Sequence, residues 1–578
     1  MMHRARRLAP ALAALLLAAS ACTALPEDGD VEVRTGVGRT ASDTGFPYKP
    51  RPPQPGESPT EIVRHFLDAM TASPISTSVA RQFLTPRASD AWQPDAAIIT
   101  YADLGTPVGS TRVDVNLVGA HRIDAGGRWA GPVAEEDSEL RFEMATEDGE
   151  WRIDDLPDAM VVPDNWFEDR YVQRNLHFFD PTGQVLVPEP VFVPRGGQTA
   201  TTLVRGLLRG PGPGLHRVEQ SFVPADLSLD VLVPEPVDGY AEVSLTGEVG
   251  AVDPTTSELL VAQFAWTLRQ VPGLTRFRLT LNGTPLGSSS VASDIAVSRG
   301  EPYDPAVPEG WRDAFAVRND ELVNVAASGV SPVEGKSVPD MSGWEQFSVD
   351  LSAGRVAGVT GDGTRVEVVP LNGSLDAEEV VQGRELLKPA WDHGDTLWTI
   401  DRGDGVAKVW AVPGRRAREV RVPGITGEEV RDFLVSRDGS RLVAIVAGPE
   451  GDEVVSARIA RDGASLRGRA FDVVWREPGE QLDLRALAWR TPTEVLVARR
   501  LGSRLTQVVH RSVDGSAATT GRDAATELVR DRVTDLVSSP VSSLPAWAVG
   551  RRRTFHPVAS GPDRFVPPEG LRGLTYPG

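Results

Sequence analysis

Cysteine is almost absent from this chain, because its 578 residues include only one. One cysteine can form neither an internal disulfide nor a paired-cysteine metal site. Long apolar runs are also scarce, and after the N-terminal segment none reaches the 18 residues that suggest a membrane-spanning helix. These shortages exclude a disulfide-stabilised scaffold, a zinc site built on cysteine pairs, and a protein that crosses the membrane several times.

Motifs of the common enzyme classes are also lacking. The eight histidines are scattered, no His-Glu-x-x-His pair occurs, and there is no Gly-x-Ser-x-Gly elbow, Walker loop or Rossmann loop. Residues Asp401–Gly405 loosely resemble a calcium loop but lack its alternating ligands and final Glu, so a hairpin turn explains them better. We therefore predict no catalytic, cofactor-binding or metal-binding residues. With 80 acidic residues, a carboxylate pair for glycan hydrolysis stays an open alternative.

Positive charge is in deficit, with 60 Lys and Arg against 80 Asp and Glu and a net charge of -20. Such a chain is poorly suited to bind nucleic acid or anionic lipid. The basic cluster Arg551–Arg553 is interpreted as an exposed strand or loop, or alternatively as a docking contact for an acidic partner.

Aromatic residues make up only 6% of the chain, whereas glycine and proline number 56 and 46, which indicates many turns and a β-rich fold. The apolar fraction of 40% is enough for several buried cores. The length indicates three or four domains.

The single cysteine, Cys22, stands at the end of a secretion signal that covers residues 1–21. Three arginines precede an apolar stretch, Leu8–Ala19, which is too short to span a bilayer. The triplet Ala19-Ser20-Ala21 supplies the small residues that a signal peptidase requires. With Cys22 it resembles the lipobox of bacterial lipoproteins, although Ala19 stands where Leu is usual and the triplet also fits an ordinary secretory site. We predict lipidation of Cys22.

Residues 22–57 are rich in proline and carry almost no apolar pattern, so we expect a semi-rigid tether or a disordered segment. The next domain, predicted over 58–174, opens with Ser58-Pro59-Thr60-Glu61, a capping box with proline at the first helical position. A short helix is expected around Val79–Leu84, ending at Thr85-Pro86. Strand-like runs follow at 97–104, 111–123, 139–145 and 151–154.

Helices followed by a curled antiparallel sheet resemble the NTF2-like cone. Such cones can enclose a ligand, but no convergent catalytic set is present. The polar candidates in this domain, each more readily interpreted as a surface residue, are Asp90, Asp95 and His121.

The second domain is predicted over 175–300 and mixes helices with strands. One helix covers Ala200–Leu208, and another is expected to begin with a capping box of Thr255 and Glu258. Short strands are predicted at 186–188, 191–194, 231–233, 241–245 and 277–281. This order resembles the GerMN-type domain of spore-germination and envelope proteins, and Thr199–Arg209 and Thr267–Gly283 carry the likeness.

The remaining residues, 305–578, contain short strands punctuated by Asp-Gly and Asn-Gly pairs, which favour type I′ hairpins. A motif recurs with Ser348, Trp391, Ser436, Trp489 and Ser538 as markers, in steps of 43, 45, 53 and 49 residues. Four-stranded propeller blades have this period, so we predict a β-propeller of five or more blades. Residues 314–326 are expected to complete the last blade and close the ring. An irregular β-sandwich is the alternative.

The order of these parts resembles the actinobacterial lipoprotein LpqB family over essentially the whole mature chain. The resemblance implies a multidomain, β-rich protein with an NTF2-like α+β domain, a GerMN-type α+β domain and a C-terminal β-propeller. It also implies a lipid anchor on the extracytoplasmic face of the cell membrane and no enzyme activity. The family is associated with the MtrA–MtrB two-component system, so the implied partner is the extracytoplasmic domain of an MtrB-like sensor histidine kinase.

Only Cys22 carries over from the family as a functional residue. Two functions are therefore weighed. One is a lipoprotein that modulates a sensor kinase and thereby cell-envelope homeostasis. The alternative is an envelope protein that binds or processes peptidoglycan or another glycan.

Overall fold

A computed structural model provides the structure of the chain. Everything that it describes belongs to one compact unit, residues 45–578. The described residues are 48–248, 253–286, 294–306, 313–333, 339–371, 376–463, 465–477, 479–516, 526–558 and 565–578.

The first domain begins with helix α2 (Pro59–Ala69), whose capping box between Ser58 and Glu61 is confirmed. Its apolar face is buried against the sheets of the domain. The short helix expected around Val79–Leu84 is η1 (Ala80–Phe83), and it ends before Thr85-Pro86 as predicted. Pro86 then begins a further helix that was not predicted, α3 (Pro86–Ala91). The Thr85 side chain caps that helix by accepting the Ala88 N–H at 3.2 Å. Proline is well tolerated there, since the first helical N–H has no intrahelical partner.

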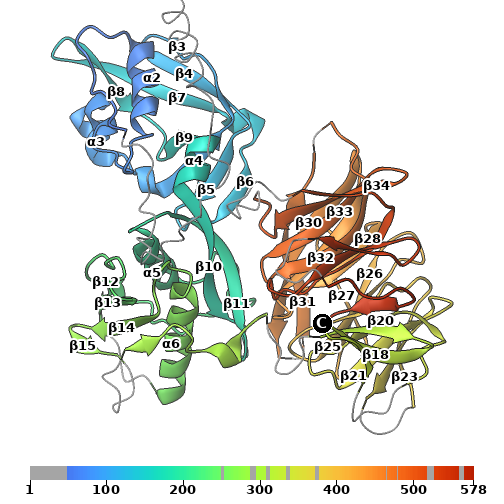
Figure 1. Ribbon diagram of the computed structural model, residues 1–578. Coiled ribbons are helices and arrows are strands. Elements are labelled where there is room, and N and C mark those ends of the chain that lie inside the picture. Colours follow the sequence, from blue (N-terminus) through green and yellow to red (C-terminus); the bar gives the residue numbers. More distant parts are fainter. Residues whose placement is uncertain are drawn as a thin grey trace, which may run out of the picture. The chain divides into compact units, whose positions relative to one another are not determined.

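Two sheets complete this domain (Figure 1). Their strands pair antiparallel except β1 and β9, which run parallel, so the expected antiparallel sheet is not purely antiparallel. The alternating burial of β7 matches its alternating sequence and leaves one wet face. The strands and short helices of the domain are η1 (Ala80–Phe83), η2 (Pro94–Ala96), β1 (Ala97–Tyr101), β2 (Asp103–Leu104), β3 (Val108–Gly109), β4 (Arg112–Val118), β5 (His121–Asp124), β6 (Trp129–Pro132), η3 (Glu135–Asp137), β7 (Glu139–Glu147), β8 (Glu150–Asp155), β9 (Met160–Pro163) and α4 (Asp164–Arg170).

The second domain is entered through a long hairpin, β10 (Tyr171–Phe179) and β11 (Leu186–Pro194), which pair along their whole length. Two short strands were expected where β11 is continuous. Two further expectations are also wrong, since 231–233 forms no strand and the second helix is capped by Asp253. The Asp253 carboxylate accepts the N–H groups of Thr255 and Thr256 at 3.0 and 3.1 Å.

The core of this domain lies between its helices and a mixed sheet. Strands β13 and β14 run parallel, so the helix between them makes a crossover connection. The elements are α5 (Thr199–Arg209), β12 (Ser228–Leu229), β13 (Tyr240–Thr246), α6 (Pro254–Leu268), β14 (Arg276–Leu281), β15 (Thr284–Pro285), β16 (Ile295–Ala296) and η4 (Glu301–Tyr303).

The rest of the chain forms six sheets among the described residues, which we number as blades one to six. Blade one contains β39 (Arg572–Thr575), β17 (Ala314–Arg318), β18 (Glu321–Ala326) and β19 (Gly329–Pro332). Blade two contains β20 (Trp344–Val349), β21 (Arg355–Thr360), β22 (Arg365–Pro370) and β23 (Glu378–Gln382). Blade three contains β24 (Ala390–Trp391), β25 (Thr396–Asp401), β26 (Lys408–Pro413) and β27 (Arg418–Val420).

The last three blades follow the same antiparallel order. Blade four contains β28 (Val430–Val435), β29 (Arg441–Gly448), β30 (Gly451–Asp462) and β31 (Ser465–Trp475). Blade five contains β32 (Leu484–Thr491), β33 (Glu494–Gly502), β34 (Leu505–Ser512) and β35 (Glu527–Val529). Blade six contains β36 (Val533–Val537), β37 (Ala546–Gly550) and β38 (Phe555–Val558).

The propeller is closed by its two ends. The C-terminal strand β39 pairs with β17, with Phe315 opposite Thr575, so the first blade is built from both ends of the domain. The prediction that residues 314–326 close the ring is therefore confirmed. The five repeated motifs lie on or beside the first strands of blades two to six, and both recurrent tryptophans are buried, Trp391 at 2% and Trp489 at 7% exposure.

The turn type expected at the Asp-Gly pairs of the propeller is wrong. A type I′ turn requires positive φ at both central residues. The glycines at 363, 405, 439, 463 and 515 have positive φ, but the aspartates before them do not. These turns therefore place only the glycine in the left-handed region, whereas Asn282-Gly283 has φ of 49° and 76° as expected for type I′.

Candidate functional site

The residues singled out from the sequence do not form one site. Cys22 lies outside the described residues. Asp90 and Asp95 are exposed on separate short helices, and His121 is half-buried on β5. The His121 ring packs 4.8 Å from Trp129, and burial lowers the pKa of this histidine. The interpretation of the two aspartates as surface residues is confirmed, and that of His121 only in part.

Asp401 has a structural role rather than a role as a calcium ligand. Its Oδ1 accepts the backbone N–H groups of Arg384, Glu385 and Gly403 at 3.0–3.1 Å. The hairpin interpretation is confirmed, because β25 ends at Asp401 and β26 follows directly. Across the described ranges, no group of three or more His, Cys, Asp or Glu side chains is placed to hold a metal ion.

The cluster Arg551–Arg553 occupies the exposed turn between β37 and β38, as one of its two interpretations predicted. Its use as a docking contact stays a prediction. None of the helices in the part of the chain that the structure describes is long and apolar enough to cross a membrane.

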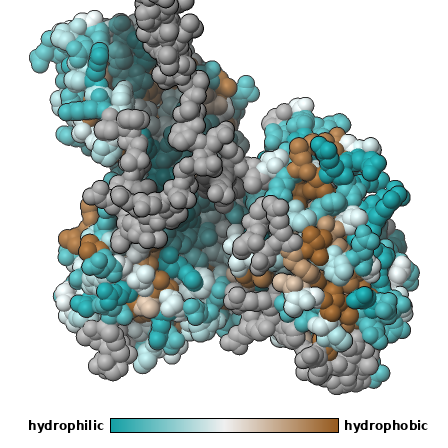
Figure 2. All heavy atoms as spheres, in the orientation of Figure 1, coloured by the Kyte–Doolittle hydropathy of each residue, from teal (hydrophilic) through white to brown (hydrophobic). Residues whose placement is uncertain are grey.

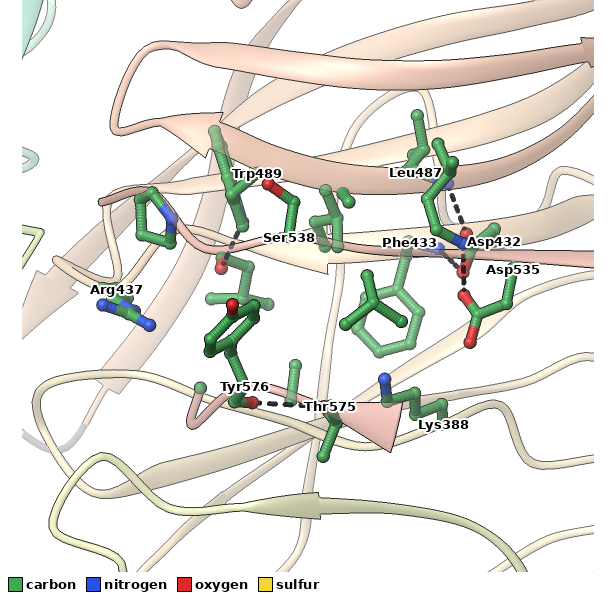
Figure 3. Close-up of a pocket in the computed structure, with 18 of the residues that line it drawn as sticks. Lys388, Asp432, Phe433, Arg437, Leu487, Trp489, Asp535, Ser538, Thr575 and Tyr576 are labelled. Atoms are coloured by element: carbon green, nitrogen blue, oxygen red, sulfur yellow. Dashed lines mark hydrogen bonds between the residues drawn. The ribbon is translucent and has the colours of Figure 1, made fainter. Parts of the chain in front are cut away.

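A cavity lies at the centre of the propeller (Figure 3). The cavity measures about 90 Å³ and is lined by the first strands of blades four to six, by the segment before β24, and by the C-terminal residues. Its wall is largely apolar, with Phe433, Leu487 and Trp489 among the lining side chains. This volume is large enough for several water molecules or a small polar group.

Two aspartates, Asp432 and Asp535, lie close to each other at one side of this cavity (Figure 3). The Asp432 carboxylate accepts the backbone N–H groups of Phe433 at 2.9 Å and of Leu487 at 2.8 Å, the second from the neighbouring blade. Asp535 accepts the N–H of Leu536 at 2.8 Å. Both aspartates directly follow a β-bulge, which turns them away from the regular strand pattern.

Burial and the neighbouring Asp535 carboxylate raise the pKa of Asp432 to about 7. Burial also raises the pKa of Asp535. Lys388 lines the same cavity and opposes both shifts by its positive charge. The pair can therefore hold a proton close to neutral pH and offers a partner for a small positively charged group.

The sequence reasoning missed this pair. One weak signal was present, since aspartate stands immediately before or at the start of two of the repeated motifs, Phe433–Ser436 and Asp535–Ser538. That signal could not show that the two motifs face the same cavity. Only the ring of blades brings Asp432 and Asp535 together.

A larger groove of about 530 Å³ lies between blades two and three. Trp391 lines it and is 2% exposed, yet its indole Nε1–H has no acceptor among the described residues. The Arg355 guanidinium lies 4.6 Å from the centre of the same indole ring. Pockets of this size commonly bind small molecules. The groove is lined by Arg355, Val368, Pro370, Asp376, Ala377, Glu378, Val380, Trp391, Leu397, Val412, Gly414 and Arg415.

Three protein-family models match successive parts of the chain. Residues 52–168 match the N-terminal domain of lipoprotein LpqB, and 320–532 match the lipoprotein LpqB β-propeller domain. Residues 175–287 match the family described as sporulation and spore germination. The predicted fold class, with an NTF2-like α+β domain, a GerMN-type α+β domain and a C-terminal β-propeller, is confirmed.

Curated relatives match nearly the full length. Lipoprotein LpqB of Thermobifida fusca is 25% identical over 94% of this chain and 95% of its own. Lipoprotein LpqB of Mycobacterium bovis is 29% identical over 86% of this chain and 90% of its own. Among solved structures, the first GerMN domain of the sporulation protein GerM from Bacillus subtilis is 23% identical, covering 22% of this chain and 97% of its own, with a TM-score of 0.19.

Proposed function

The chain belongs to the lipoprotein LpqB family, and from this premise we propose that it is a membrane-anchored, extracytoplasmic lipoprotein that modulates an MtrB-like sensor histidine kinase. The observation that supports the proposal is the match of both LpqB family models in the order expected for the whole chain. Through the kinase, the protein acts on cell-envelope homeostasis. It works by binding rather than by catalysis.

The anchor in this proposal is the lipid on Cys22. Burying acyl chains contributes about 0.8 kcal/mol per CH₂ group, so two or more chains hold a protein stably at the membrane. The Pro-rich segment 23–57 then keeps the folded body within reach of the membrane surface. Confinement raises the effective concentration of the body at the kinase, so that even a micromolar contact is occupied.

The contact with the kinase is assigned to the first and second domains, which follow the tether directly. An exposed apolar group in the second domain supports this assignment. Val231, Leu232 and Val237 are 58%, 64% and 70% exposed, beside β12. Figure 2 shows apolar side chains gathered at this edge of the domain. Exposed apolar side chains that lie together mark protein contact sites.

To change signalling, the body must bind the two states of the kinase with different affinity, because equal binding shifts no equilibrium. The contact can be tested by calorimetry with the kinase's external domain and the full mature chain carrying Cys22→Ser. We expect binding that is weakened at least tenfold by the double change Val231→Ser and Leu232→Ser. Leu528→Ser is the matched control, since Leu528 is 61% exposed on β35 of the propeller, outside the assigned contact. Absence of binding at about 100 µM would reject the contact.

A second candidate function is glycan binding, and the groove between blades two and three favours it. Its buried Trp391 indole N–H lacks an acceptor, and a sugar hydroxyl could supply one. Sedimentation with purified peptidoglycan tests this function. Retention of the wild-type chain, lost in Trp391→Phe, would support it, whereas equal retention of both proteins would remove the groove from consideration.

A further inference from the structure

The hairpin β10–β11 of the GerMN-type domain contacts the propeller. On β10, the Gln173 side-chain amide donates to Asp514 Oδ2 at 2.9 Å and to Ser512 Oγ at 3.1 Å. Asn175 Oδ1 accepts a hydrogen bond from Thr493 Oγ1 at 3.3 Å. These partners belong to blade five, so one edge of the hairpin is fixed by neutral and charged hydrogen bonds.

A buried ion cluster joins β11 to blade four. Glu189 is 2% exposed and accepts from Arg441 Nη2 at 2.7 Å and from Arg458 Nη2 at 2.7 Å. Arg441 is 1% exposed and also donates to the Pro188 carbonyl at 3.2 Å. Buried charges are costly unless they are paired and hydrogen-bonded. The cluster therefore specifies one docked arrangement of the two domains.

The loop after α5 belongs to the same contact. The backbone N–H of Arg461, on β30, donates to the Arg217 carbonyl at 3.1 Å. The Arg217 side chain lies 3.8 Å from Asp462, and both groups are exposed. Docking of the loop thus leaves the charged pair Arg217 and Asp462 in water. Two residues further along the loop stands Glu219.

That residue, Glu219, is completely buried, and neither of its carboxyl oxygens has a hydrogen-bond partner among the described residues. The charged groups that face it come from every side of the contact: Glu189 on β11, Arg441 on β29, Arg458 on β30 and Arg128 before β6. Arg441 and Arg458 already donate to Glu189. A carboxylate without a hydrogen bond in such a site is strongly disfavoured relative to the neutral acid.

We propose that Glu219 is a proton-binding site that couples pH to the docking of the GerMN-type domain on the propeller. Docking buries the protonated carboxyl group between the two domains. When the domains separate, water reaches the group and the proton is released to the solvent. The two domains therefore act as a latch that mild acidification tightens and alkaline conditions loosen.

The direction follows from the pKa of each group. Burial, and after it the charge on Glu189, raise the pKa of Glu219 well above its ordinary value, although the three arginines oppose the shift. In the separated state that pKa returns to about 4.3. Docking is thus fully favoured below this value and weakens by up to about tenfold per pH unit as the pH rises toward the docked pKa.

Two other carboxyl groups at the contact titrate with docking. Burial raises the pKa of Asp514, so this group contributes in the same direction as Glu219. Burial alone would raise the pKa of Glu189 too, but Arg441 and Arg458 together hold it well below its usual range. Glu189 therefore favours docking at neutral pH and loses this effect only when the pH falls below about 4.3.

Hydrogen–deuterium exchange of the full mature chain carrying Cys22→Ser tests the latch. The amide of Arg461 reports opening of the contact, and the buried strand β25 of blade three is the internal reference. After correction for intrinsic exchange, we expect the protection of Arg461 to fall between pH 5.5 and pH 8 while that of β25 stays constant. Unchanged protection of Arg461 across this range would overturn the proposal without any variant.

Variants assign the effect to one carboxyl group. Glu219→Gln removes the charge at nearly constant shape, so protection of the contact should be high and lose most of its pH dependence. Glu219→Met is the substitute if the amide variant does not fold. Glu242→Gln, on the exposed face of β13, should keep the wild-type dependence. The same slope in Glu219→Gln as in the wild type would refute the assignment.

Discussion

Two tryptophans that occupy equivalent places in the propeller should respond differently to loss of the indole N–H. Trp489 Nε1 donates to the Val435 carbonyl of the neighbouring blade at 2.9 Å. Trp391 Nε1 has no acceptor among the described residues, although its side chain is the more deeply buried of the two. Replacement of each tryptophan by phenylalanine therefore separates the hydrogen bond from the burial of the ring.

The magnitudes follow from these contacts. Trp→Ala at either position should lower the free energy of unfolding by ~3–5 kcal/mol, because a large buried ring is lost and a cavity remains. Trp489→Phe also removes a hydrogen bond, which contributes about 1 kcal/mol. Trp391→Phe instead removes a buried donor without an acceptor, and that change offsets part of the lost packing. We expect Trp489→Phe to be more destabilising than Trp391→Phe by about 1–2 kcal/mol.

Urea unfolding followed by far-ultraviolet circular dichroism measures the difference. The comparison is valid if the free energy of unfolding depends on urea with the same slope in both variants. A shift of the unfolding midpoint then reports a change of stability alone. The reasoning would be refuted by equal destabilisation of the two Phe variants, or by a larger loss for Trp391→Phe. A loss below about 1 kcal/mol for either Ala variant would mean that its ring is not packed in the folded protein.

Three further predictions follow from the anchor, the propeller and its cavity. Cys22→Ser should release the chain into the medium; continued membrane fractionation, with no labelled fatty acid on the wild type, would contradict lipidation. Residues 305–578 should fold alone, because each blade packs mainly on its neighbours, and an insoluble or unfolded fragment would contradict this boundary. Asp535→Asn should lower the pKa of Asp432 by removing the like charge. The raised pKa of Asp432 in the folded protein lowers stability as the pH rises through it. Thermal stability of the wild type should therefore fall between pH 6 and pH 8, and that of the variant should fall less. Identical curves of thermal stability against pH would contradict the coupling.

The propeller could be predicted because its signals are local. Each tight turn and each repeated motif is visible within a short window of sequence, and the return of the motif in steps of 43 to 53 residues indicates successive blades. The turn type at the Asp-Gly pairs could not be predicted, because the same dipeptide fits a turn in which only the glycine is left-handed. The sequence predicted a cap at Thr255, but Asp253 caps helix α6. Both are good capping residues, and only the direction from which the chain enters the helix decides between them.

The ionisable groups at the propeller centre and at the domain contact were also beyond prediction, but for a different reason. Asp432 and Asp535 are ordinary members of two motifs until closure of the ring places them in one cavity. Glu189 stands between two prolines in a strand and gives no sign that Arg441 and Arg458 will surround it. Such sites depend on contacts between distant segments, which local periodicity does not encode.

The proposal that this lipoprotein modulates a sensor kinase is tested most directly in cells by the phosphorylated fraction of the partner response regulator. Three strains are compared: wild type, a deletion of the lipoprotein, and the deletion complemented with Cys22→Ser. The account predicts that deletion changes the phosphorylated fraction, and that the unanchored variant restores it only weakly because its effective concentration at the kinase is lost. An unchanged phosphorylated fraction in the deletion strain would contradict the proposed function.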